Sequence, residues 1–326
     1  MRPLKYLSVL IFFFSISRAQ VLYPSLQTTA DNIPDFNFGE IKKMKVKTIV
    51  FDLVDKKDFQ VAEDKDLSRH YEFDSLGRLV RCYYTVISRI VQQEFRTAPI
   101  YRKRRRVSGG SITFKNVYEF DTLSCVFLYD KNNNLTCKRL RDGNFYTSTY
   151  YWYDSINRVN RVLSCKETNA SMDRSVFVLG TQQVLFDERY KYVASSPDQY
   201  KKLCLNDENR VYKEIITDLN KNKQPLKYNE SFVTTWINQL TTFTYNEKNQ
   251  VTEKKYTSNA SGTIELKETY EYKNDLLDTE KHYKNDVLLS ETGYVYDTGT
   301  NILNSYVTRD PVSKSLQIVK LVYTYY

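Results

Sequence analysis

The chain has 326 residues and a formal net charge of +9, and 14% of its residues are aromatic, including 28 tyrosines. This composition excludes intrinsic disorder, because disordered chains lack aromatic and β-branched residues. Beyond the first 20 residues, no run approaches the ~20 apolar residues of a membrane-spanning helix. We therefore expect a folded, β-rich chain with no integral membrane span.

Residues 1–19 have the pattern of a secretory signal peptide. Arg2 and Lys5 precede an apolar run over 7–16, and small residues follow at Ser17 and Ala19. We expect cleavage after Ala19 and export to the periplasm, the outer-membrane region or the cell surface. The cysteines show no regular spacing, so we interpret them as buried strand residues with at most two disulfides. They are Cys82, Cys125, Cys137, Cys165 and Cys204.

Residues 20–69 form a leader without obvious repetition. Residues 45–52 alternate roughly as a strand does, and residues 51–66 are charged and rich in turn formers. We expect N-terminal cap strands here, which would protect the first edge of the sheet from aggregation.

Residues 70–326 repeat a short pattern, seen as YEFDSLGRL at 71–79 and YWYDSINRV at 151–159. Large apolar or aromatic residues stand three and one positions before a turn residue. Gly or Asn commonly stands three positions after it, and an aliphatic residue stands five after it. An eighth copy starts at Tyr118 and has no clear second half. The turn residues of the other copies are Asp74, Asp130, Asp154, Asn206, Asn246, Lys273 and Asp297.

Each part of this pattern predicts an antiparallel hairpin. Residues two apart share a face of a strand, so the aromatic pairs form a stripe on one sheet face. Asp or Asn at the turn entry accepts hydrogen bonds from backbone N–H groups, and Gly or Asn tolerates the left-handed conformation that closes the loop. We therefore predict an all-β chain of consecutive antiparallel hairpin repeats that form a twisted, elongated sheet.

The segments YEFDSLGRL, FLYDKNNNL and YWYDSINRV resemble the YD repeats of Rhs-like proteins. The resemblance covers residues 70–326, and the chain is similar to the short, exported YD-repeat proteins of Bacteroidota-type bacteria. This resemblance implies hairpins that wind into a long β strip and an exported protein. It supplies no catalytic mechanism.

A basic insertion at residues 95–112 interrupts the repeats. It contains five consecutive cations, Arg102, Lys103, Arg104, Arg105 and Arg106. We predict either an anion-binding loop for phosphates or acidic polysaccharide, or a solvated, mobile loop. Nucleic acid is not expected as a partner, because export removes the chain from it.

Catalytic patterns are absent from the sequence, and we expect neither an enzyme nor a cofactor or metal site. The two histidines, His70 and His282, lie in different hairpins, and we interpret both as edge or stripe residues. Three Asp-Ser/Thr-aliphatic segments resemble acceptors of O-glycosylation in Bacteroidota-type exported proteins. Their hydroxyl residues are Ser75, Thr122 and Ser155.

The sequence favours a non-enzymatic binding or scaffold module in an envelope complex, with an envelope or cell-surface protein as partner. One alternative is a carbohydrate-binding protein that uses a tyrosine-rich sheet face, because tyrosine stacks on sugars. The other alternative is an outer-membrane β-barrel, suggested by the aromatic last strand at 321–326. Against it, Glu253, Lys254 and Lys255 would put charge on both faces of a strand.

Overall fold

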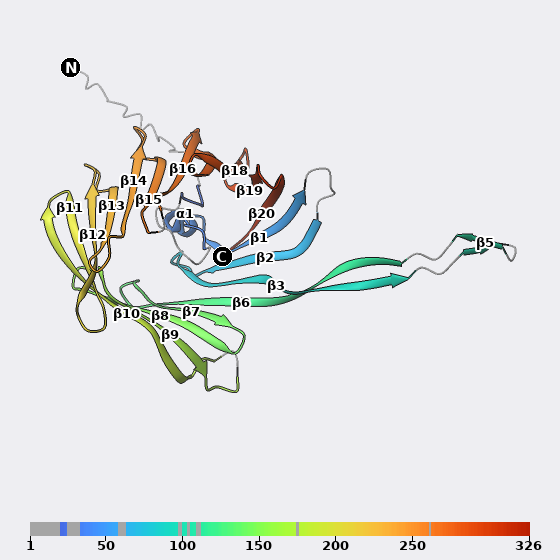
Figure 1. Ribbon diagram of the computed structural model, residues 1–326, viewed down its shortest axis with the longest axis horizontal. Coiled ribbons are helices and arrows are strands. Elements are labelled where there is room, and N and C mark those ends of the chain that lie inside the picture. The colour runs from blue at the N-terminus through green and yellow to red at the C-terminus, as the bar shows by residue number, and fades with distance from the viewer. Residues whose placement is uncertain are drawn as a thin grey trace, which may run out of the picture.

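The computed structural model describes residues 20–24, 33–57, 63–96, 100–102, 105–108, 112–173, 176–260 and 262–326. These residues form an antiparallel sheet of 18 strands, a separate two-stranded sheet and one short helix (Figure 1). The elements are α1 (Phe38–Lys43), β1 (Val46–Lys57), β2 (Glu63–Phe73), β3 (Leu79–Arg96), β4 (Ile100–Arg102), β5 (Arg105–Ser108), β6 (Ile112–Tyr129), β7 (Leu135–Asp142), β8 (Phe145–Tyr153), β9 (Val159–Asn169), β10 (Leu179–Ser196), β11 (Gln199–Leu205), β12 (Val211–Leu219), β13 (Pro225–Phe232), β14 (Asn238–Tyr245), β15 (Val251–Ser258), β16 (Ile264–Lys273), β17 (Leu276–Lys284), β18 (Val287–Tyr296), β19 (Leu303–Asp310) and β20 (Ser315–Tyr325).

The large sheet closes on itself, so the predicted open, elongated sheet is wrong. β1, which precedes the repeats, pairs with β2 on one side and with the last strand, β20, on the other. The result is a closed 18-stranded barrel, the architecture that the outer-membrane alternative required. Closure removes both exposed sheet edges. A hairpin pattern specifies only neighbours along the chain, so it does not reveal that the first and last strands meet.

The barrel has two rims, which we name after their connections. We call the closed sheet the wall, and its antiparallel strands place successive turns at opposite ends. One end, the turn rim, carries the turns at Asp74, Asp130, Asp154, Asn246 and Asp297. The turn at Asn206 joins β11 to β12 and therefore lies at the opposite end, the arm rim. There β3 and β6 extend beyond the wall as a two-stranded arm, which ends in β4 and β5 (Figure 1).

The aromatic stripe faces the lumen. Tyr71 and Phe73 pack edge-on against Phe36 of the N-terminal segment, with ring centroids 4.9 and 5.2 Å apart. Further along the wall, tyrosine hydroxyls donate to backbone carbonyls of a neighbouring hairpin over 2.6 to 2.9 Å. The pairs are Tyr129 to Leu79, Tyr153 to Leu135, Tyr192 to Val159, Tyr245 to Pro225, Tyr272 to Val251, Tyr296 to Leu277 and Tyr323 to Leu303. The stripe therefore links neighbouring strands from the lumen side, so the tyrosine-rich face that the carbohydrate-binding alternative would use lies inside the barrel.

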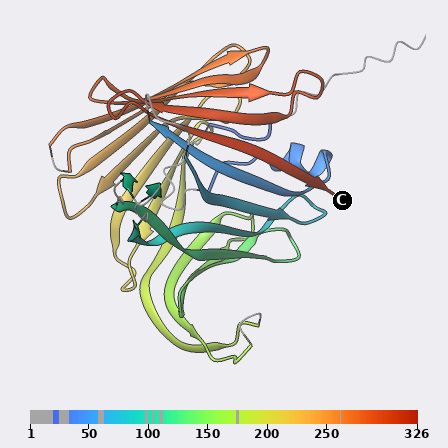
Figure 2. The ribbon, with the colours of Figure 1, turned by 90° about the vertical axis from the view of Figure 1, so that its right-hand side faces the viewer.

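The N-terminal segment lies in the lumen at the turn rim. We call residues 20–24 and 33–45, which include α1, the plug. Its Val21, Phe36 and Ile41 share one buried core with wall residues of β1, β2, β3, β6, β19 and β20. The C-terminus lies at the same rim (Figure 2), and the Tyr326 amide donates to the Lys45 carbonyl. The main hydrophobic core of the barrel thus sits between the plug and the wall.

Candidate functional site

A cavity of about 630 Å³ lies between one side of the plug and the wall at the turn rim. Apolar side chains from both sides supply most of its lining, namely Ile33, Pro34, Phe36, Phe38, Leu76, Leu79, Phe127, Tyr129 and Leu135. On the other side of the plug, a second cavity of about 820 Å³ has a polar lining that includes Glu40, Gln224, Asn249 and Gln250. We call the apolar space the mouth cavity.

Four charged residues border the mouth cavity: Asp35, Lys42, Arg78 and Lys138. The Arg78 guanidinium is fixed in place, because it donates to Asp74 over 2.7 Å and lies 4.7 Å from the centre of the Tyr129 ring. Burial of the Asp74 carboxyl opposes ionisation, but the hydrogen bonds from Arg78 outweigh this and lower its pKa. The border therefore carries an excess of positive charge.

Gly77 sets how closely the plug approaches this cavity. Its φ of +79° lies in the left-handed region that favours glycine. A Cβ at this position would stand 2.7 Å from Lys42 Cβ and 2.9 Å from Lys42 Cα, on α1. Only glycine allows both the turn and the contact with α1, so the Gly of the YEFDSLGRL copy holds the plug against the wall.

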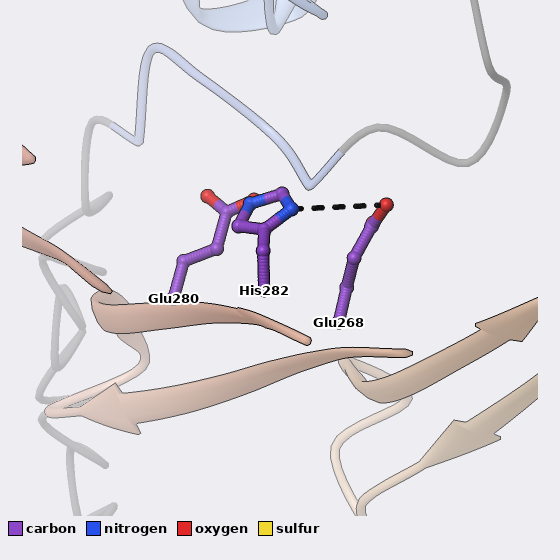
Figure 3. A group of neighbouring side chains, drawn as sticks. All are labelled: Glu268, Glu280 and His282. Atoms are coloured by element: carbon purple, nitrogen blue, oxygen red, sulfur yellow. Dashed lines mark hydrogen bonds and ion pairs between the residues drawn. The ribbon is translucent and has the colours of Figure 1, made fainter. Parts of the chain in front are cut away.

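A second group of functional side chains lies on the lumen face of β16 and β17: Glu268, Glu280 and His282 (Figure 3). His282 Nε2 lies 2.7 Å from Glu280 Oε1, and His282 Nδ1 lies 4.0 Å from Glu268 Oε1. Register explains the grouping, because Glu268 is directly opposite His282, and Glu280 is two residues before His282 on the same face. We call these three residues the lumen cluster.

Tyrosine hydroxyls and a lysine surround the lumen cluster. Tyr270 donates to Glu268 and Tyr294 donates to Glu280, each over 2.5 Å, while Lys254 Nζ lies 3.3 Å from Glu268. Burial of Glu280 opposes ionisation, but the hydrogen bonds from His282 and Tyr294 outweigh it and lower the pKa of this carboxyl. Burial alone would lower the pKa of His282, yet the contact with Glu280 raises it.

A third carboxylate, Glu167, is fully buried on the outer face of the wall. It accepts hydrogen bonds from Ser148 over 2.5 Å, from Tyr150 over 2.7 Å and from Gln182 over 2.7 Å. The Arg139 guanidinium lies 3.6 Å from the same carboxylate. We call this group the outer cluster.

Ion pairs cover other parts of the outer face. Lys254 points into the lumen, so the alternation of a strand directs Glu253 and Lys255 outward. Lys255 bonds Glu265 on the next strand over 2.9 Å. Further outward pairs join neighbouring strands around the ring, namely Arg81 with Glu72, Arg161 with Asp187, Lys201 with Glu214, and Lys281 with Glu271 and Glu291.

The residues singled out in the sequence fall in scattered places. Ser75 and Ser155 are exposed in turns, whereas Thr122 is exposed within β6 rather than in a turn. The turn residues Asp74, Asp130, Asp154, Asn206 and Asn246 each accept backbone hydrogen bonds from the residue four positions on. In the basic run, Arg102 ends β4, Arg105 and Arg106 begin β5, and Lys103 and Arg104 lie outside the described residues, as does the segment 1–19.

Sequence reasoning missed the lumen cluster and one turn. Glu268 stands two residues before Tyr270 and therefore on the same strand face as the stripe residues Tyr270 and Tyr272. A charged residue at a position of the aromatic stripe was the signal that the sequence offered. Asn220 caps a turn as the other turn residues do, and Lys223 in that turn has φ of +61°. It escaped detection because Thr217 and Leu219 replace the aromatic pair.

Comparison with known proteins gives distant structural likenesses only. No family model and no curated protein matches the chain. A porin-like protein from Bacteroides uniformis is 12% identical with a TM-score of 0.36, and the match covers 86% of this chain and 97% of that one. A porin-like protein from Bacteroides vulgatus is 9% identical with a TM-score of 0.28, covering 63% and 94%. The Photorhabdus luminescens Tc holotoxin pore is 12% identical with a TM-score of 0.29, covering 80% of this chain and 12% of that one.

No family model supports YD repeats, so the resemblance to Rhs-like proteins stays a prediction from the sequence. Of the functions expected from the sequence, the β-barrel is better supported than the open scaffold, since the wall is closed. Within the described part of the chain, no helix has the length and apolar character needed to cross a membrane.

Proposed function

We propose that this protein is a hollow β-barrel of the bacterial cell envelope that binds a small ligand in its mouth cavity, without catalysis. The mouth cavity carries this proposal. It combines about 630 Å³ of volume with a mostly apolar lining and a few polar groups, which is the usual character of a small-molecule site. An envelope protein as a further partner stays a prediction from the sequence.

The charges around the mouth cavity favour a ligand with an apolar body and an anionic end. Three cations, Lys42, Arg78 and Lys138, stand against one acid, Asp35, at its border. A carboxylate or phosphate headgroup can accept hydrogen bonds from such cations, while the apolar tail replaces water along Leu79, Phe127 and Leu135. A fatty-acid-like amphiphile meets both demands.

The residues on the outer face of the barrel determine whether the wall can contact lipid. An outer-membrane barrel needs a closed ring and an apolar outer band. The ring is closed, but pairs such as Lys255 with Glu265 and Lys281 with Glu271 stand on its outer face. A lysine facing lipid at mid-depth costs about 2–4 kcal/mol. We therefore propose that this wall faces water and that the barrel associates with the envelope from the aqueous side.

Extraction tests this placement. Membranes from cells that express the full chain are washed with high salt and carbonate, then with detergent. We expect the barrel in the aqueous washes. Recovery only with detergent would contradict the water-facing wall and would favour insertion into the outer membrane.

Binding of cis-parinaric acid, a fluorescent fatty acid, tests the mouth cavity. We expect Leu76→Trp to weaken binding at least about tenfold, because the larger side chain enters the cavity. Ile156→Trp is a matched control, since Ile156 holds the same position two residues after its turn aspartate and does not line the cavity. Equal binding by both variants would contradict the proposed site.

The methyl ester of the same acid tests the proposed headgroup. It keeps the apolar tail and loses the negative charge, so we expect it to bind more weakly to the wild-type chain. We expect Lys138→Gln to reduce this preference for the acid. An equal affinity for acid and ester would retain an apolar site and reject the anionic end.

A further inference from the structure

We propose that Glu268, Glu280 and His282 bind one divalent transition-metal ion in the lumen, with zinc as the best match. The three residues offer one imidazole nitrogen and two carboxylate oxygens that lie within 4.8 Å of one another. This departs from the absence of a metal site expected from the sequence. It is independent of the proposed ligand in the mouth cavity.

The donor set matches zinc more closely than calcium or magnesium. Imidazole suits zinc and its neighbours, whereas calcium and magnesium prefer oxygen ligands alone. Three protein ligands leave a fourth position on a tetrahedral zinc ion for water or for a bound molecule. His282 Nε2 and Glu280 Oε1 are hydrogen-bonded over 2.7 Å. An ion that binds both residues has to break this hydrogen bond and take its place.

The surroundings hold both carboxylates in position. The Tyr270 hydroxyl donates a hydrogen bond to Oε2 of Glu268, and the Tyr294 hydroxyl donates one to Oε2 of Glu280. The other oxygen of each carboxylate, Oε1, is the one near His282. Outer partners of this kind orient the ligands of protein metal sites. The side chains of His282, Glu268 and Glu280 are 38, 20 and 15% exposed, so an ion can reach them.

Lys254 gives the proposal its sharpest test. Its ammonium group lies 3.3 Å from Glu268 and competes with any cation for that carboxylate. Like charges at such short range repel each other, so the charge of Lys254 weakens the binding of a metal ion at Glu268. Loss of this charge should therefore strengthen metal binding, whereas most substitutions near a binding site weaken it.

The experiment measures Zn²⁺ binding to the chain from Gln20 by equilibrium dialysis and elemental analysis. We expect one Zn²⁺ per chain, at least about tenfold weaker binding in His282→Gln, and several-fold tighter binding in Lys254→Met. Cobalt(II) serves as a spectroscopic probe. Its spectrum should lack the charge-transfer band of thiolate ligands, since all five cysteines are buried elsewhere.

Two variants serve as controls. His70→Gln removes the other histidine, which stacks on Tyr83 and lies outside the lumen cluster. Glu188→Gln changes a carboxylate that also accepts from two tyrosines, Tyr190 and Tyr212, but lies beside no histidine. We expect both to keep wild-type affinity. Unchanged binding in His282→Gln, or weaker binding in a folded Lys254→Met, would overturn the proposal.

Discussion

The outer cluster and the lumen cluster both hold carboxylates in the barrel wall, yet the burial and the partners of these carboxylates differ. Glu167 in the outer cluster is 0% exposed and accepts hydrogen bonds from Ser148, Tyr150 and Gln182. Phe177 adds a cover, with its ring centre 3.6 Å from the Arg139 guanidinium. In the lumen cluster, His282 is 38% exposed on its side chain and stands between two acids.

The difference separates a structural role from a site. A fully buried carboxylate that accepts three hydrogen bonds has no access to solvent, so its role is to stabilise the wall. A half-exposed histidine between two acids can exchange a proton with solvent and can also bind an ion. Burial alone therefore does not identify a functional carboxylate. The identity and exposure of its partners do.

The largest expected effect comes from the outer cluster. Glu167→Gln places an amide donor among the donors of Ser148, Tyr150 and Arg139, and it removes the charge that Arg139 faces. We expect a loss of about 2–3 kcal/mol in the free energy of unfolding, because buried donors lose their partner. Urea denaturation followed by tryptophan fluorescence measures it.

The control for Glu167 is Glu214→Gln, on the same outer face. Glu214 pairs with Lys201 over 2.6 Å, but both side chains are about one-third exposed. Such exposed pairs contribute roughly 0–1 kcal/mol. A loss at Glu167 no larger than the loss at Glu214 would remove the distinction between the two kinds of carboxylate.

A smaller effect is expected when the same substitution is made in the lumen cluster. Glu280→Gln keeps the shape, and the half-exposed His282 can turn to water for its lost partner. We therefore expect a loss of about 1 kcal/mol in the free energy of unfolding, with Tyr294 losing a charged acceptor. A loss as large as that of Glu167→Gln would show that the lumen cluster is structural too.

Much of the fold was readable from the sequence because the repeat fixes local geometry. The pattern predicted antiparallel hairpins, and at the third position after the turn residue the expected left-handed conformation occurs in Gly77, Asn133, Asn157, Asn209 and Asn249. Closure was not readable, because the contact between β1 and β20 joins residues about 270 positions apart that carry no shared motif. Which side of the sheet the aromatic stripe faces depends on this closure, so the sequence did not reveal that either.

The sites were less predictable than the fold, since both depend on contacts across distant segments. The mouth cavity needs the plug against β3, β6 and β7, and the plug has no repeat signature. The lumen cluster needs the register that sets Glu268 opposite His282. Each residue alone reads as an ordinary polar strand position, so only the paired strands reveal the group.

The smallest expected effect is a pH dependence confined to the lumen cluster. The contact with Glu280 raises the pKa of His282, so its stabilisation is fully present below about pH 6.5 and is lost as the pH rises through the pKa of the folded state. Glu280, with a lowered pKa, contributes stability above about pH 4.3 that is lost on further acidification. The cluster therefore stabilises the barrel most between these values.

His282→Gln isolates the histidine part of this dependence. We expect the wild-type free energy of unfolding to fall by less than about 1 kcal/mol between pH 6 and 8 because of this residue, and the variant to lose that part of the slope. His70→Gln, which keeps the lumen cluster intact, should retain the slope. If both variants retain it, the titrating group lies elsewhere, and the lumen cluster would resemble the outer cluster in holding its charges fixed.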